Sequence, residues 1–255
     1  SAHEIGRKCV AVNVSDIEAM GASPVTMVVA FSAPPDLPTR WAREFMTGLR
    51  DEAALAGVSL VGGDMARSRS ITIAITVIGE TQGRPPVLRS GAQIGDIVAV
   101  KGRLGWSGAG LSVLGRGFRS PRAVVDAHRV PQTPYGAGRT AALAGATSMI
   151  DVSDGLLADL AHVCVASGVG IDLDTARIVI DEPLRVVGQA TGRDPLSFVL
   201  TGGEDHALAA TFPPGNVPGD WAVIGRVIDP TPYGDPGVLV DGERHEKAGW
   251  DHFAS

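Results

Sequence analysis

The stretch of sequence that decides the fold is "MIDVSDGLLADLAHV", residues 149–163. It begins with an apolar segment typical of a buried strand and continues with an apolar segment typical of a helix. Asp151 and Asp154 lie at the junction, and we expect the helix to run from Asp154 to about Ala166. A strand followed at once by a helix favours a fold in which the two alternate. Either aspartate alone could serve as a turn residue or a cap, so two of them raise the question of a ligand.

The same alternation extends upstream of this stretch. We expect a helix from Ile5, a second helix over residues 39–56 that ends near Gly57, and strands in "VTMVVAFSAPP", "VSLVGGD" and "SITIAITVIGE". Ser1 and Glu4 fit a capping box for the first helix. An apolar stripe at helical spacing along this helix is formed by Ile5, Cys9, Val12, Asp16 and Met20.

A domain boundary is predicted near Gly83. The stretch "TQGRPPVLRSGAQIGD" contains glycine and proline and has little periodicity. We therefore expect an N-terminal domain over residues 1–83 and a C-terminal α/β domain over residues 84–255. In the second domain, "DIVAVKG" and "SMIDV" predict strands, and "AVVDAHRV" and "YGAGRTAALAGATS" predict helices. The chain as a whole predicts the α+β class, with mixed α/β character, in two domains.

Composition narrows the classes of function. With 255 residues, 44% of them apolar, the chain can bury a substantial core, and its net charge of −6 without a basic run disfavours nucleic acid as a partner. An acidic protein that binds phosphates needs metal cations between its carboxylates and the ligand. Cys9 and Cys164 lie far apart in apolar runs, which is typical of reduced thiols in a cytoplasmic protein. We find no apolar run of about 18 residues and no signal peptide, so we expect no membrane partner.

Acidic residues recur where helices and strands are expected to end. They are found in the segments "NVSD", "VGGD", "IDVSD" and "TGGED", which contain Asp16, Asp64, Asp151, Asp154, Glu204 and Asp205. Several carboxylates gathered in one cleft would raise each other's pKa unless divalent cations neutralised them. Ligands that are all oxygen atoms select Mg²⁺ or Ca²⁺ over zinc. The acid spacing in "DVSDG" does not match an EF-hand loop, which disfavours a calcium buffer.

A nucleotide site, if there is one, is not of the P-loop type, because the chain lacks the G-x-x-x-x-G-K-[ST] motif. Two features suggest other ways of holding phosphate. Arg89 lies in the inter-domain stretch, where a guanidinium can reach a phosphate in the cleft. A glycine series that opens a predicted helix either presents N–H groups to phosphate or only lets the helix pack closely; it consists of Gly102, Gly105, Gly108 and Gly110.

Taken in order, "AVNVSDIEAMGASP", "LVGGD", "LRSGAQIGD", "MIDVSDGLLADLAHV", "LTGGEDHAL" and "GWDHF" resemble the thiamine-monophosphate kinase family. That family belongs to the aminoimidazole ribonucleotide synthetase-like superfamily. The resemblance implies a two-domain fold of that superfamily, whose N-terminal domains form a β-barrel in a homodimer. It also implies ATP-dependent phosphorylation of thiamine monophosphate to thiamine diphosphate, with ATP and Mg²⁺ bound.

The resemblance also implies roles for individual residues. It implies metal binding by Asp16, Asp64, Asp151 and Asp154, with Asp64 and Asp151 catalytic. It implies nucleotide contacts from Gly63, Asp64, Arg89 and Ser153, and substrate contacts from Glu204 and Trp250. The thiazolium ring of thiamine is a permanent cation, and the face of an indole ring attracts cations.

The chain departs from the family pattern in three respects. Met65 and Ala66 follow "GGD" where the family usually has Thr, and His206 stands where an aromatic residue is common after "GGED". Two acidic motifs of the family would precede Ser1. Two alternatives therefore stay open: another ATP-using enzyme of the superfamily, such as an amidine cyclase or a selenophosphate synthetase, and an inactive metal-binding dimer.

Overall fold

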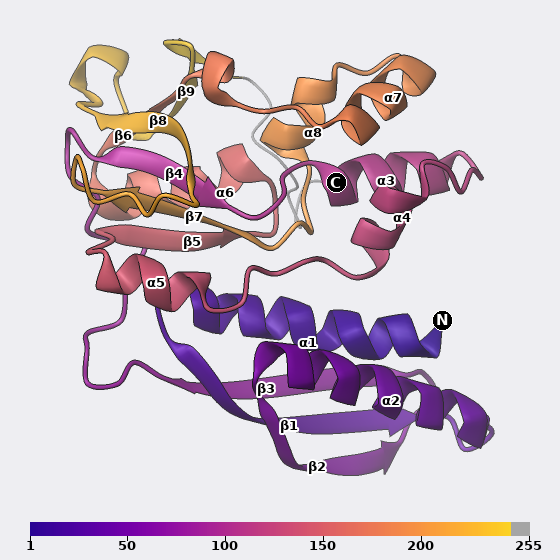
Figure 1. Cartoon of the computed structure of the whole chain (residues 1–255). Helices are drawn as coiled ribbons and strands as arrows, with labels where there is room; N and C mark the ends of the chain where they lie inside the picture. The colour runs from indigo at the N-terminus through magenta and orange to yellow at the C-terminus, as the bar shows by residue number, and fades with distance from the viewer. Residues whose placement is uncertain (246–255) are drawn as a thin grey trace.

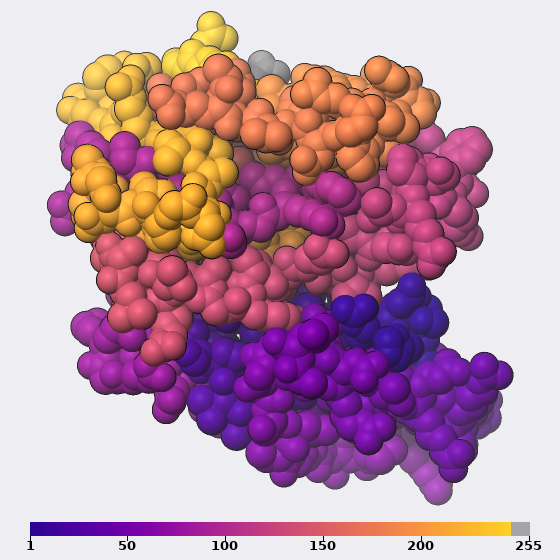
Figure 2. Space-filling model, in the orientation of Figure 1, coloured from indigo at the N-terminus to yellow at the C-terminus, as the bar shows by residue number. Residues whose placement is uncertain are grey.

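The computed structural model describes residues 1–245, which form two β-sheets with helices packed around them (Figure 1). The N-terminal part occupies one half of the molecule and the C-terminal part the other half (Figure 2). The N-terminal elements are α1 (Ala2–Ala19), β1 (Ser23–Ala33), α2 (Thr39–Ala56), β2 (Ser59–Arg67) and β3 (Thr72–Glu80). These bounds confirm the predicted order of elements, and α2 has the predicted limits, with Gly57 in the left-handed conformation after its last residue.

In the described part of the chain, the N-terminal sheet has three strands in the order β2-β1-β3, with β1 parallel to β2 and antiparallel to β3. Helices α1 and α2 cover one face of this sheet. The buried side chains between helices and sheet include Val10, Val14, Met27, Phe45 and Leu49. Along β3 half-buried and exposed residues alternate, and β2 is exposed almost throughout. The second face of the sheet is therefore open in the single chain.

The first helix is confirmed with its capping box, since Ser1 Oγ accepts the Glu4 N–H and the Glu4 side chain accepts from the Ser1 backbone. The residues of the predicted apolar stripe do not form the buried face of this helix, because Ile5 is 41% exposed and Met20 is 38% exposed. The residues that α1 buries are mostly small: Ala2, Gly6, Val10, Ala11, Val14, Ser15, Glu18 and Ala19. Small residues let α1 pack closely on two sides, and a search for large apolar residues misses such a face.

Within residues 1–245, the C-terminal sheet has seven strands in the order β10-β9-β6-β8-β4-β7-β5, and among their pairs only β6 and β9 run parallel. Its strands are β4 (Ile97–Lys101), β5 (Ser148–Val152), β6 (Gly170–Leu173), β7 (Ala207–Phe212), β8 (Ala222–Ile228), β9 (Gly237–Val240) and β10 (Glu243–Arg244). Its helices are α3 (Trp106–Gly115), α4 (Arg122–Arg129), α5 (Ala137–Leu143), α6 (Leu156–Ser167), α7 (Glu182–Thr191) and α8 (Pro195–Thr201). One apolar core lies between this sheet and α6.

Helix α1 lies between the two halves of the molecule (Figure 1). Its buried Glu18 accepts hydrogen bonds from the N–H groups of Gly136 (2.7 Å) and Gly138 (2.9 Å), which open α5. The Thr133 hydroxyl donates to the carbonyl of Ala11 (3.2 Å). Because α1 packs against both halves, the division into residues 1–83 and 84–255 stays a prediction.

Two expectations from composition can be compared with the described residues. Cys9 is half-buried, Cys164 is buried, and both are free thiols, as predicted. Among residues 1–245, no helix combines the length and the apolar character needed to cross a membrane.

Glycines let α1 and α2 touch backbone to backbone, and this contact generates a prediction. A Cβ atom at Gly48 would lie 1.9 Å from the His3 carbonyl oxygen, so Gly48→Ala must push the helices apart. We expect it to lower the free energy of unfolding by roughly 1–3 kcal/mol, measured by urea denaturation. Gly115→Ala, at a helical position with nothing within 4 Å, is the matched control. It should be neutral or stabilising by up to about 1 kcal/mol, and equal losses in both variants would contradict the packing argument.

Candidate functional site

The candidate site surrounds Asp151, near the end of β5. Its side chain is buried, and its Oδ2 atom accepts a hydrogen bond from Ser15 Oγ of α1 (2.9 Å). The same oxygen lies 3.1 Å from Nδ1 of His206, which is also buried. The other ring nitrogen of His206, Nε2, is buried without a hydrogen-bond partner in the described part of the chain. Three segments that are distant in sequence therefore meet at one carboxylate.

The turn after Asp151 is held by a residue that the sequence analysis did not single out. A single oxygen of Asp159, Oδ2, accepts the N–H groups of Ser153 (3.0 Å), Asp154 (3.0 Å) and Gly155 (3.1 Å). Gly155 has non-helical backbone angles (φ 120°, ψ 147°), so α6 begins at Leu156 and the prediction of a start at Asp154 is wrong. Burial raises the pKa of Asp159 to about 7, and the charges of Asp151 and Asp154 act in the same direction.

Asp16 lies within electrostatic reach of Asp151. Burial raises the pKa of Asp16, the negative charge of Asp151 raises it further, and His206 and Arg89 lower it. The structure thus brings together two predicted metal ligands and the predicted nucleotide-binding arginine. A carboxylate whose pKa is raised by a neighbouring carboxylate is the kind of donor that a divalent cation stabilises.

Asp64 is exposed on β2, where it pairs in register with Ala30 of β1. Its side chain makes no hydrogen bond or ion pair with the rest of residues 1–245. Beside it, a Cβ atom at Gly63 would lie 2.2 Å from the Val29 carbonyl oxygen, so close strand packing already requires this glycine. Within residues 1–245, no three His, Cys, Asp or Glu side chains are placed to hold one metal ion. The assignment of Asp16, Asp64, Asp151 and Asp154 as a metal cluster stays a prediction.

The glycine-rich loop before α3 is not open to phosphate. The carboxylate of Asp205 accepts the N–H groups of Gly105 and Ser107 at the start of α3. Burial raises the pKa of Asp205 to about 7, although these N–H groups act to lower it. A Cβ atom at Gly105 would lie 2.8 Å from the Phe198 backbone, and one at Gly110 would lie 2.1 Å from the Val124 carbonyl oxygen. Of the two open readings, close packing is therefore the correct one.

The segment that carries Glu204 runs along the turn after Asp151. The Glu204 N–H donates to the Ser153 carbonyl (2.7 Å), and the His206 N–H donates to the Val152 carbonyl (2.8 Å). Glu204 and His206 have positive φ values of 66° and 52°, a conformation that costs free energy for non-glycine residues. Strain of this kind persists only where the surroundings fix the backbone, and here the anchored Asp205 lies between the two residues.

Glu204 forms an ion pair with Lys8 of α1, whose Nζ lies 2.7 Å from Glu204 Oε2. Partial burial acts to raise the pKa of Glu204, but the hydrogen bond and charge of Lys8 hold it below the usual range. Lys8, Ser15 and Asp159 did not stand out in the sequence. Trp250, the second predicted substrate contact, lies outside the described residues.

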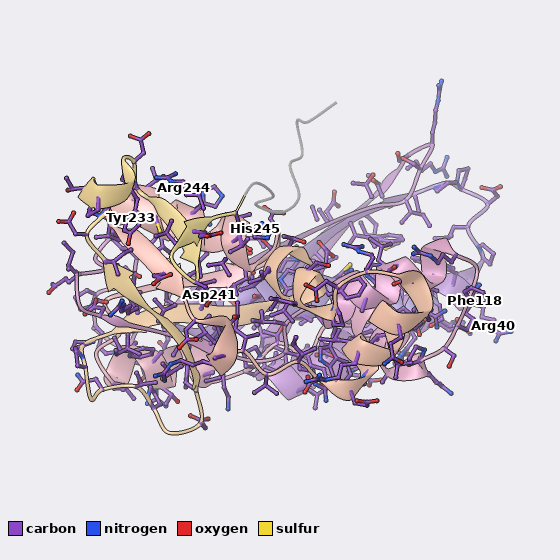
Figure 3. The ribbon with its side chains drawn as sticks, turned by 90° about the horizontal axis from the view of Figure 1, so that it is seen from above. Arg40, Phe118, Tyr233, Asp241, Arg244 and His245 are labelled. Atoms are coloured by element: carbon purple, nitrogen blue, oxygen red, sulfur yellow. The ribbon has the colours of Figure 1, made fainter. Side chains whose placement is uncertain are left out.

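A cavity of about 430 Å³ lies elsewhere, on strands β4, β6 and β8. It is lined in part by Asp172, Arg177 and Asp241 and by none of the predicted site residues. Asp241 lies in the same part of the molecule as Tyr233 and Arg244, far from Phe118 and Arg40 (Figure 3). This cavity is separate from the candidate site.

Known proteins resemble the chain over nearly its whole length. Residues 1–81 match the family described as AIR synthase related protein, N-terminal domain, and residues 93–232 match the C-terminal domain family of the same description. Over 252 residues the chain is 48% identical to the thiamine-monophosphate kinase of Mycobacterium tuberculosis, an alignment that covers 98% of this chain and 74% of that protein. Over 255 residues it is 33% identical to the Aquifex aeolicus thiamine-monophosphate kinase, covering 98% of this chain and 81% of that one. The solved structure "AaThiL complexed with AMPPCP and TMP" matches 99% of this chain and 81% of its own, with a TM-score of 0.91 and 32% identity.

The buried Asp205 leads to a prediction on pH dependence. Its pKa is raised from 3.8 to about 7, so between those values the folded protein holds a proton that the unfolded chain has released. This contribution to stability is fully present below about pH 4 and is lost as the pH rises through about 7. Asp205→Asn cannot titrate. Wild type should therefore lose stability relative to this variant over that window, by at most about 1.4 kcal/mol per pH unit.

Urea denaturation of both proteins at several pH values between 4 and 8 measures this difference. Asp36→Asn, at an exposed loop position, is the control and should follow wild type at every pH. Parallel stability curves for wild type and Asp205→Asn would contradict the raised pKa.

Proposed function

Because the chain belongs to the thiamine-monophosphate kinase family, we propose that it transfers the γ-phosphoryl group of ATP to thiamine monophosphate, giving thiamine diphosphate and ADP. The observation that carries this proposal is the 48% identity to a thiamine-monophosphate kinase over 98% of the chain. The solved relative at a TM-score of 0.91 is complexed with AMPPCP, an analogue of ATP, and with TMP. Neither another enzyme of the superfamily nor an inactive dimer has a comparable observation in its favour.

The reaction is a direct in-line displacement. An oxygen of the phosphate group of thiamine monophosphate attacks the γ-phosphorus of ATP, and the bond from that phosphorus to the oxygen of the leaving ADP breaks. The attacking phosphate is already ionised near neutral pH, so the site needs no strong general base. The work of the protein is to position two anionic groups and to compensate their charge.

The acidic residues of the site fit Mg²⁺. Asp16 and Asp151 interact as like charges, and the donors are all carboxylate oxygens. Asp16, Asp64, Asp151 and Asp154 are the residues that would hold magnesium. When bound, Mg²⁺ neutralises charge on the triphosphate and on the transferring phosphoryl group. Ser15 and His206 orient the Asp151 carboxylate, and Asp159 fixes the turn that carries Ser153 and Asp154.

The remaining assignments concern the two substrates. Gly63, Asp64, Arg89 and Ser153 would contact ATP. Glu204 and Trp250 would contact thiamine monophosphate. The Glu204 N–H bonds to the carbonyl of Ser153, so a proposed substrate contact lies next to a proposed ATP contact. This supports a transfer between adjacent ATP and thiamine monophosphate sites.

A homodimer is also part of the proposal. The open face of the N-terminal sheet and its edge leave large apolar side chains exposed: Val28 is 40% exposed, Val61 63% and Ile78 61%. Exposed apolar patches of this kind often mark interfaces, and a second copy of the sheet would cover this one and close a barrel. Because both cysteines are free thiols, we further infer a cytoplasmic location.

The proposed activity is tested directly with the full chain. Incubation with thiamine monophosphate, ATP and MgCl₂ should produce thiamine diphosphate and ADP in equal amounts, measured by liquid chromatography. Addition of EDTA in excess over magnesium should stop the reaction. ATP consumption that needs a different acceptor would indicate another enzyme of the superfamily instead.

Asp151→Asn should abolish turnover while the protein stays folded, because the variant keeps the side-chain shape but loses the charge of a metal ligand. We expect kcat/KM to fall on the order of 1000-fold. Circular dichroism and a thermal melt check the fold. Asp36→Asn, which removes an exposed carboxylate that is not among the proposed site residues, should keep full activity. Near-normal turnover in folded Asp151→Asn would remove this residue from the metal site.

A further inference from the structure

Lys8 is the cation that lies against the proposed substrate contact Glu204. Its Nζ is 2.7 Å from Glu204 Oε2 and 3.2 Å from the carbonyl oxygen of His128. The Lys8 side chain is 28% exposed and that of Glu204 is 51% exposed, so the pair lies at the surface of the site rather than in a core. The two residues come from different halves of the molecule, since Lys8 belongs to α1 and Glu204 precedes β7.

Glu204 is the fixed member of the pair. Its backbone has a positive φ, its N–H is bonded to the Ser153 carbonyl, and the next residue is anchored at the start of α3. Lys8 has a long flexible side chain with three N–H donors, and only two of them are used within residues 1–245. Lys8 is therefore able to bind an additional acceptor without losing its place in the fold.

The chemistry of the proposed substrate complements this pair. Thiamine monophosphate is a zwitterion with a fixed thiazolium cation and an anionic phosphate. A fixed carboxylate beside a flexible ammonium group matches these two charges. A ligand with only one of the charges could satisfy only one member of the pair.

We propose that Lys8 is a substrate-binding residue that contacts the phosphate of thiamine monophosphate, while Glu204 contacts the cationic part of the molecule. This inference rests on the proposed function, whose substrate it takes as given. On binding, the third donor of Lys8 contacts the phosphate, and the cationic part of the substrate lies against Glu204. This arrangement favours a ligand that carries both charges over thiamine, which lacks the phosphate.

The competing explanation is that Lys8 only holds Glu204 in place. The two explanations differ in their prediction for thiamine. If Lys8 contacts the phosphate, its loss weakens the binding of thiamine monophosphate alone. If Lys8 only positions Glu204, its loss weakens both ligands equally, because both carry the same cation.

The test is calorimetric titration of wild type, Lys8→Met and Lys8→Arg with thiamine monophosphate and with thiamine, each in the presence of AMPPCP and MgCl₂. For Lys8→Met we expect the Kd of thiamine monophosphate to rise about 10- to 100-fold. The Kd of thiamine should stay within about twofold of the wild-type value. Lys8→Arg keeps the charge and should recover part of the affinity for thiamine monophosphate.

Lys101→Met is the matched control, because Lys101 also forms an ion pair, with Asp220 at 2.6 Å, and is 30% exposed. It should bind both ligands like wild type. Glu204→Gln should weaken both ligands, since both carry the cation. Equal weakening of the two ligands in Lys8→Met, or no weakening of either, would overturn the assignment while wild-type binding and turnover stand. Failure of wild type to bind thiamine monophosphate would instead overturn the proposed function, and the assignment with it.

Discussion

The structure depends on the contact that fixes α1 between the two sheets. Glu18 is buried, and its carboxylate is satisfied by two N–H groups at the start of α5. A buried carboxylate without such partners would cost several kcal/mol. One turn or less away, Ser15 bonds to Asp151, so the same helix that is fixed by Glu18 reaches the candidate site. The placement of Asp16 and Lys8 follows from the placement of this helix.

Buried acids in this chain shape the backbone as well as surround the site. Asp159 gathers three N–H groups of one turn, and Asp205 gathers two N–H groups at the start of α3. Each satisfies donors that would otherwise need water or a ligand. They thereby fix the backbone of two predicted site residues, since Asp154 donates its N–H to Asp159 and Glu204 directly precedes Asp205. Asp159 and Asp205 are therefore structural: they fix the turns that carry the predicted site residues Asp154 and Glu204.

Local signals in the sequence were sufficient for most of the helices and strands. Residues 39–56 are confirmed as a helix because Pro38 precedes it and Gly57 ends it, and both effects act within a few residues. The prediction of the apolar stripe of α1 missed its buried face, because that face is built from small residues that pack on two sides. The role of the glycine-rich loop was undecided, since Asp205 lies 98 residues beyond Ser107 in the sequence. The motifs "NVSD" and "IDVSD" identified Asp16 and Asp151 as candidate site residues. Their proximity could not be predicted, because it depends on packing between segments that are distant in sequence.

Helix α1 also limits how this protein can exchange parts with its relatives during evolution. A C-terminal half transferred from another member would have to meet α1 with a glycine at position 138, where a Cβ atom would lie 1.9 Å from the Glu18 carbonyl oxygen. It would also need a hydroxyl at Thr133 to reach the Ala11 carbonyl. Recombination at the link between the sheets would separate each of these residues from its partner. The segment 133–138 and helix α1 should therefore be inherited together, and hybrids that divide them should be rare.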